Sequence, residues 1–172
     1  MNKSINRKEF LFALIASLCF IVLALYSFFA DIWFAKSALL GRIEFMDVVG
    51  WLVFAALAVV LFLENKNAFL ITAAVYSLMY LINLFRIFDT QLLLSFLACL
   101  ALTAVAFLSC MGHPIISKVW FVPAVLMFIG ALIAWISYKY FSNFRVYWMT
   151  ILANLFEVAA VLFAGRWLKE TL

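Results

Sequence analysis

The sequence predicts an all-α protein of the membrane: a bundle of six transmembrane helices with both termini on the cytoplasmic side. The 172 residues are 70% hydrophobic and 12% charged, whereas a soluble domain carries roughly 25% charge. Residues 10–30 contain no charged side chain, and about 20 apolar residues of helix cross the hydrocarbon core of a bilayer. Similar apolar runs recur along the rest of the chain. The lipid bilayer is therefore the first partner that the sequence implies.

These apolar runs are continuous, which favours helices over membrane strands. Strands of a membrane barrel alternate apolar and polar residues over about 10 positions. The first run, 10–30, is also longer than the apolar region of a secretory signal, about 7–15 residues followed by small residues. Bulky Phe28 and Phe29 stand where those small residues would be. We therefore expect 10–30 to be retained as the first span.

The other five spans are predicted at 47–63, 68–88, 92–110, 119–138 and 147–167. Because most connections are short, consecutive helices are expected to be antiparallel neighbours, and the whole chain, 1–172, forms a single integral-membrane domain. The longer stretch 31–46 mixes aromatic and charged residues. It fits either a short amphipathic helix on the membrane surface or a simple loop.

The distribution of basic residues favours cytoplasmic termini. With six spans and this orientation, seven Lys and Arg residues lie on the inside and five on the outside, in the direction of the positive-inside rule. The short loops are typical of a bacterial protein. We therefore expect a multi-pass protein of the cytoplasmic (inner) cell membrane.

Polar residues within the predicted spans gather on two helix faces. Glu157 lies at the centre of the sixth span, and ionisable groups at that depth are costly and often functional. Thr150 and Asn154 precede it at helical spacing on the same face. The third span carries a stripe of its own, within an arc of about 120°: Thr72, Tyr76, Tyr80, Asn83 and Arg86.

These two faces predict a candidate ligand site. We expect a polar cavity between spans three and six, open to the outside and centred on Glu157, with ligand-binding residues Glu157, Asn154, Asn83, Arg86, Tyr80, Tyr76 and Thr150. The alternative is purely structural, because polar residues on two membrane helices often only join the helices, at about 0.6 kcal/mol for each hydrogen bond.

Several other kinds of site are not indicated. Cys110 and His113 have metal-ligand spacing, but a structural zinc needs four ligands and the sequence offers no second pair. We expect no metal and no cofactor. Basic residues are scattered singly, without the cluster that tracks phosphates, so nucleic acid is not an expected partner.

Two functions therefore stay open, and a third is less well supported. The first is a small transporter, or the substrate-binding subunit of one, for a small or amphipathic ligand. In size and number of spans the chain is similar to the small substrate-binding subunits of energy-coupling vitamin transporters, which are richer in Gly and Pro. The second is a non-catalytic accessory, immunity or regulatory subunit whose partner is another membrane subunit or a second copy. The third, a membrane enzyme, needs paired acids or a histidine at a membrane face, so we expect no enzymatic activity.

Overall fold

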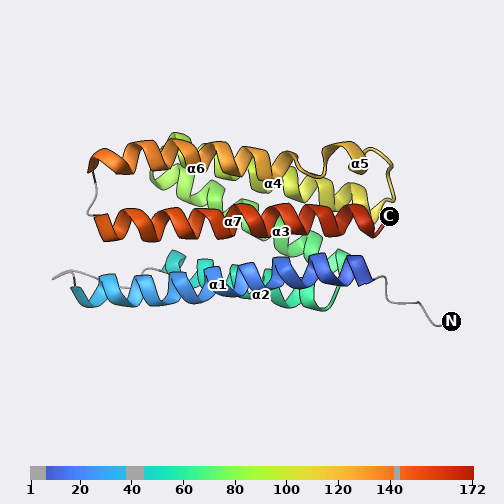
Figure 1. The fold of residues 1–172 in the computed structure, drawn as a ribbon, viewed down its shortest axis with the longest axis horizontal. Helices are drawn as coiled ribbons and strands as arrows, with labels where there is room; N and C mark the ends of the chain where they lie inside the picture. Colours follow the sequence, from blue (N-terminus) through green and yellow to red (C-terminus); the bar gives the residue numbers. More distant parts are fainter. Residues whose placement is uncertain (1–6, 38–44, 142–143) are drawn as a thin grey trace.

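The computed structural model describes residues 7–37, 45–141 and 144–172. Within these ranges all regular structure is helical, and six helical segments are long and apolar enough to cross a membrane. This confirms the predicted all-α bundle of membrane-spanning helices (Figure 1). The helices are α1 (Arg7–Ser37), α2 (Phe45–Phe62), α3 (Lys66–Arg86), α4 (Thr90–Cys110), the short α5 (Ile116–Val119), α6 (Val122–Phe141) and α7 (Phe144–Glu170).

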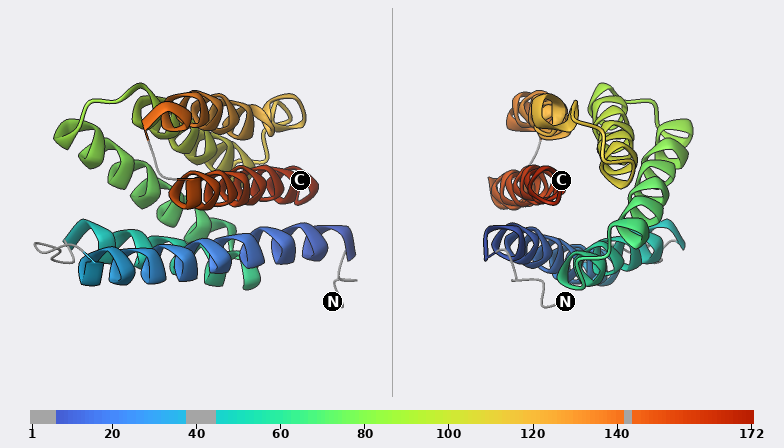
Figure 2. Two further views of the ribbon diagram at one scale, coloured as in Figure 1. Left: turned by 60° about the vertical axis from the view of Figure 1, so that its left-hand side comes forward. Right: turned by 90° about the vertical axis from the view of Figure 1, so that its right-hand side faces the viewer.

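The long helices pack in a ring. Helix α1 packs on α2, α2 on α3, α3 on α4, α4 on α6 and α6 on α7, and α7 returns to pack on α1. The end-on view in Figure 2 shows α6, α7 and α1 along one side of the ring and α3 on the other. Helices α3 and α7 therefore face each other across the interior, and their backbones hardly approach.

The described parts of the two chain ends lie at one end of this ring. Figure 1 shows the start of α1 and the end of α7 on the same side. The Lys66 Nζ atom, at the start of α3, donates to the carbonyl oxygen of Thr171 at 2.6 Å. The Arg166 guanidinium lies over the ring of Phe12. We call this the terminal end of the bundle.

Local sequence explains where several helices begin. The side chain of Asn65 accepts a hydrogen bond from the backbone N–H of Ala68, and Asp89 caps α4 in the same way; such caps satisfy the unpaired N–H groups of a first turn. Pro123 has no N–H to donate to the carbonyl four residues earlier. This accounts for the end of α5 at Val119, before α6 continues the same span.

The helix bounds differ from the predicted spans mainly where helix continues beyond the apolar run. Residues 31–37 of the predicted 31–46 connection belong to α1, and its last two residues, 45 and 46, belong to α2; residues 38–44 lie outside the described residues. The charge of Asp31 does not end α1, because its carboxylate accepts a hydrogen bond from Trp51 Nε1 of α2 at 2.6 Å. A helix ends where its backbone bonds end, not where its apolar residues do.

The outer surface of the bundle is apolar. Large side chains that are more than half exposed include Ile71, Leu52 and Ile136 on three different helices. An aqueous surface rarely carries so much contiguous apolar area, so lipid is the medium that fits it. The interior instead holds small residues between the aromatic ones. One of them, Ser17 of α1, donates a hydrogen bond to the backbone oxygen of Ala58 on α2 at 2.8 Å and so joins these two helices.

Candidate functional site

The centre of the ring holds a carboxyl group bound by two tyrosines. Glu157 is thirteen residues from Phe144 and thirteen from Glu170, hence about 20 Å from either end of α7. Its side chain is 8% exposed. The hydroxyl groups of Tyr76 and Tyr80, one turn apart on α3, both donate to its Oε1 atom. The second oxygen, Oε2, takes no part in these two hydrogen bonds.

Helices α1 and α2 supply an aromatic wall beside these tyrosines. The ring of Tyr76 meets Phe54 of α2 at 5.6 Å and Phe20 of α1 at 6.3 Å between centroids. It meets Tyr80 at 5.3 Å. All three contacts are edge-to-face, an arrangement that aromatic pairs favour. The wall fixes the ring of Tyr76, which is fully buried, with its hydroxyl group toward α7.

Helix α4 closes the site from another side. Cys99 of α4 is fully buried. It belongs to the small-residue stripe Ser95, Cys99 and Thr103 that the sequence places on one face of this helix. Ser77 of α3 and Thr103 share a hydrogen bond of 3.0 Å, so α3 and α4 are joined by polar atoms as well as by packing.

The structure brings the two predicted stripes to face each other. Helices α3 and α7 run antiparallel, as the pairs Lys66–Thr171 and Tyr76–Glu157 require. Asn83 lies three residues from Tyr80 and Asn154 three residues from Glu157, each about 4.5 Å nearer the opposite end of the bundle. Asn154 is half-buried, and among the described residues no partner is found for its buried Nδ2 atom.

The remaining predicted residues continue the same stripes away from the carboxyl group. Arg86 is the last residue of α3 and is exposed, and Thr150 is seven residues from Glu157 along α7, about 10 Å. The structure therefore brings tyrosines, rather than the arginine, to the carboxyl group. The polar cavity predicted around Glu157 stays a prediction.

The described chain also has cavities away from Glu157. One, of about 240 Å³, lies between α1 and α7 and is almost wholly apolar. Two of its lining residues are sequence neighbours of the site, because Ala153 precedes Asn154 and Phe156 precedes Glu157. The residues that line this cavity are Val22, Leu23, Tyr26, Met149, Leu152, Ala153 and Phe156.

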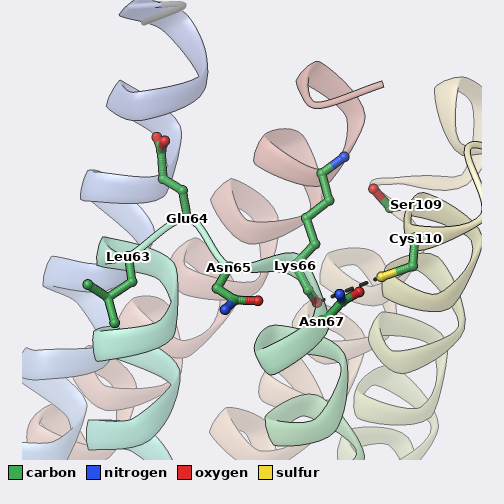
Figure 3. Close-up of a pocket in the computed structure, with 7 residues that line it drawn as sticks. All are labelled: Leu63, Glu64, Asn65, Lys66, Asn67, Ser109 and Cys110. Atoms are coloured by element: carbon green, nitrogen blue, oxygen red, sulfur yellow. Dashed lines mark hydrogen bonds between the residues drawn. The ribbon is translucent and has the colours of Figure 1, made fainter. Parts of the chain in front are cut away.

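Another cavity is an open polar pocket of about 440 Å³ at the terminal end. Figure 3 shows the turn between α2 and α3 on one side of it and the end of α4 on the other. Ser109 donates to the carbonyl oxygen of Leu168 at 3.1 Å, as Lys66 does to that of Thr171. Both bonds go to carbonyl groups at the end of α7, where a helix leaves carbonyl groups without backbone partners; the Leu168 carbonyl oxygen also accepts from the Thr171 hydroxyl group at 3.0 Å. The side chains of Lys66 and Ser109 around this pocket therefore hold the end of α7 in place.

Sequence reasoning missed the aromatic wall. Phe20 and Phe54 lie in runs of similar residues, and nothing in the sequence distinguishes them from the phenylalanines that face lipid. In the described ranges, no group of three or more His, Cys, Asp or Glu side chains could hold a metal ion. Comparison with known proteins adds no assignment, because no family model, curated protein or solved structure matches the chain.

Proposed function

We propose that the protein is a membrane transport protein, either a small transporter or the substrate-binding subunit of one, and that Glu157 is its ligand-exchanging group. The observation that carries this proposal is a carboxyl group at mid-membrane held by tyrosine hydroxyl groups from the opposite helix. Ionisable groups at such depth commonly mark a route for ions or substrates. We propose a binding and transport activity rather than an enzymatic one.

The chemistry of the site favours a proton or a cationic group as the species exchanged. Among the buried residues of the described chain, Glu157 carries an ionisable acidic group, whereas the other buried polar residues are serines. An ionised carboxylate at this depth needs a compensating positive charge. A proton supplies it in the simplest case. A protonated amine would in addition meet the side chains of Tyr76, Phe54 and Phe20, which lie together beside the carboxyl group and whose ring faces can interact with a cation.

The packing also supports exchange at this position. The backbones of α3 and α7 hardly approach, so the hydrogen bonds to Glu157 depend on two long tyrosine side chains. The aromatic wall holds Tyr76 in place, but the half-buried side chain of Tyr80 can change rotamer without separating two closely packed helices. The Nδ2 atom of Asn154, for which no partner is found among the described residues, lies one turn from Glu157 and can donate to a carbonyl or hydroxyl oxygen of an incoming ligand or to a water molecule.

Infrared spectroscopy tests the proton part of the proposal. The purified protein in lipid nanodiscs is titrated with acid and base while the carboxyl stretching band is followed. We expect a band that titrates in the wild type and in the Glu64→Gln control, at an exposed position, and that is missing in Glu157→Gln. An identical titration in wild type and Glu157→Gln overturns the proposal.

Native mass spectrometry tests the ligand part. The protein extracted from its own membrane should carry a small, positively charged molecule in the wild type and in Glu64→Gln and lose it in Glu157→Gln. An equal load on all three proteins would place the bound molecule somewhere other than Glu157.

A second function is favoured by one observation. Glu157 is 8% exposed and already receives two hydrogen bonds, as polar residues do that only fix helix packing. On this second proposal the protein is a non-catalytic accessory, immunity or regulatory subunit. The native mass spectra of the protein would then contain a second polypeptide or a second copy of this chain, and the Glu157→Gln variant would keep that partner.

Localisation belongs to the same proposal. We propose a bacterial cytoplasmic membrane with the terminal end inside. Six of the seven basic residues that the sequence assigns to the inside lie on described helices or turns of the terminal end: Arg7, Lys8, Lys66, Lys118, Arg166 and Lys169. Cytoplasmic loops carry such an excess.

A further inference from the structure

Two cations share one tryptophan ring at the terminal end. The guanidinium carbon of Arg166 lies 5.3 Å from the centroid of the Trp120 ring and 5.5 Å from that of Phe12. The Nζ atom of Lys169, three residues further along α7, lies 5.6 Å from the same Trp120 centroid. We call Lys118, Trp120, Arg166 and Lys169 the Trp120 cluster.

The backbone is built to hold Trp120 in this place. The irregular step between α5 and α6 presents the Trp120 carbonyl group to α7. There the facing residue is Gly165, and a Cβ atom at this position would overlap the Trp120 carbonyl oxygen. Because glycine allows this close approach, the Trp120 ring lies beside the side chains that follow at 166 and 169.

The Trp120 cluster lies at the edge of the apolar part of the bundle. The span that contains Trp120 begins at Ile116, and the span that contains Arg166 and Lys169 ends at Glu170. Directly after Trp120, Phe121 is 43% exposed and Val122 is 36% exposed. Tryptophan favours the boundary between acyl chains and headgroups, and the two exposed residues continue from it into the acyl region.

The charges of the cluster are unbalanced. Arg166 forms an ion pair of 2.7 Å with Glu170, which compensates one positive charge. Lys169 approaches the same tryptophan ring as Arg166, and Lys118, exposed on α5, lies two residues from Trp120. Arg166 and Lys169 thus meet at one tryptophan ring with one carboxylate beside them, and Lys118 adds a further positive charge two residues from Trp120 in the sequence.

We propose that the Trp120 cluster binds the headgroup phosphate of an anionic phospholipid in the leaflet at the terminal end. The side chains of Arg166, Lys169 and Lys118 supply the positive charge, and the acyl chains lie over Phe121 and Val122. Basic groups between membrane helices on the cytoplasmic side recognise anionic headgroups in this way. The proposal is independent of the function of Glu157.

The test is native mass spectrometry of the full-length protein titrated with phosphatidylglycerol or phosphatidylcholine. We expect the wild type to prefer phosphatidylglycerol. Removal of one cluster charge should weaken phosphatidylglycerol binding about fivefold, so that Arg166→Gln combined with Lys169→Gln weakens it about 25-fold. Lys8→Gln is the matched control at the same end, and we expect it to change affinity less than twofold. Glu170→Gln removes the competing carboxylate and should tighten binding.

Three results would overturn the proposal. The first is equal affinity of the wild type for the two lipids. The second is an equal loss of affinity in the double variant and in Lys8→Gln. The third is displacement of the lipid by inorganic phosphate at similar concentration, which would indicate a soluble phosphate ligand instead. Should the double variant fail to fold, the exposed variant Lys118→Gln and the Glu170→Gln variant still give opposite expected shifts.

Discussion

The hydroxyl group of Tyr76 on α3 donates a hydrogen bond to Glu157 of α7 across the interior of the helix ring. The two residues belong to helices whose backbones hardly approach each other. The bond therefore connects opposite sides of the bundle through side chains alone. Tyr80 repeats it one turn further along, and Phe69 of α3 meets Trp167 of α7 at 5.4 Å nearer the terminal end. Contacts between α3 and α7 thus run along the inside of the ring.

Glu157→Leu should destabilise the protein because it leaves two tyrosine hydroxyl groups in the core without their acceptor. The expected loss in the free energy of unfolding is about 1–3 kcal/mol, measured by unfolding in mixed micelles. Glu157→Gln is the matched control, since its amide oxygen can still accept from both tyrosines. Equal stability of the Leu variant and the wild type would contradict the hydrogen bonds described here.

A double-mutant cycle isolates one of these bonds. Tyr76→Phe and Glu157→Leu should show a coupling energy of about 0.6 kcal/mol, the average for hydrogen bonds between membrane helices. Thr72→Val supplies the control cycle, because Thr72 lies one turn before Tyr76 and donates to Ala68 within its own helix. If the two cycles give the same coupling energy, Tyr76 has no specific bond to Glu157.

Gly165→Ala should disturb the junction of α5, α6 and α7. The added methyl group would overlap the Trp120 carbonyl oxygen, and a backbone group cannot move aside as the end of a side chain can. Overpacking of this kind costs about 1–3 kcal/mol, which a lower unfolding temperature would reveal. Gly50→Ala is the control, since the nearest atom to a Cβ there is the sulfur of Met79 at 3.8 Å, and we expect it to be tolerated.

The cysteines report the orientation of the protein. Cys110 is exposed at the terminal end, whereas Cys99 is buried. A membrane-impermeant maleimide should therefore label Cys110 in inside-out vesicles and not in intact cells, if the terminal end is cytoplasmic. Thr90→Cys in a Cys110→Ser background places a thiol at the other end of α4, and it should be labelled from the outside. The reverse pattern would overturn the proposed orientation.

Much of the fold follows from the sequence because its main signal is long and repeated. Six apolar runs of bilayer length define the helices, and short connections make neighbours antiparallel. Glu157 was found for a simple reason: a charge at the centre of an apolar run is costly enough to need an explanation. Tyr76 and Tyr80 followed from helical spacing, which put them on one face of α3 whatever the tertiary structure.

The rest depends on which helices meet, and periodicity does not contain that information. Phe20 and Phe54 are part of the site because α1 and α2 turn those faces inward, yet both are surrounded in sequence by equally apolar residues. The contact of Gly165 with Trp120 joins two segments 45 residues apart in the sequence. Arg86 was predicted to line the same cavity, at a distance from Glu157 along the membrane normal; it is the last residue of α3, whereas the two tyrosines bond to the carboxyl group.

The position of α7 at the end of the chain has a consequence for biogenesis, because α7 both closes the ring and carries the acceptor for the tyrosines of α3. Tyr80 and Glu157 are 77 residues apart, so at a synthesis rate of 5–20 residues per second about 4–15 s pass between them. During that interval the insertion machinery receives α3 before its hydrogen-bond acceptor has been translated. The tyrosine hydroxyl groups of α3 therefore stay without this acceptor until α7 arrives from the ribosome, and only then can α7 pack on α1 and close the ring.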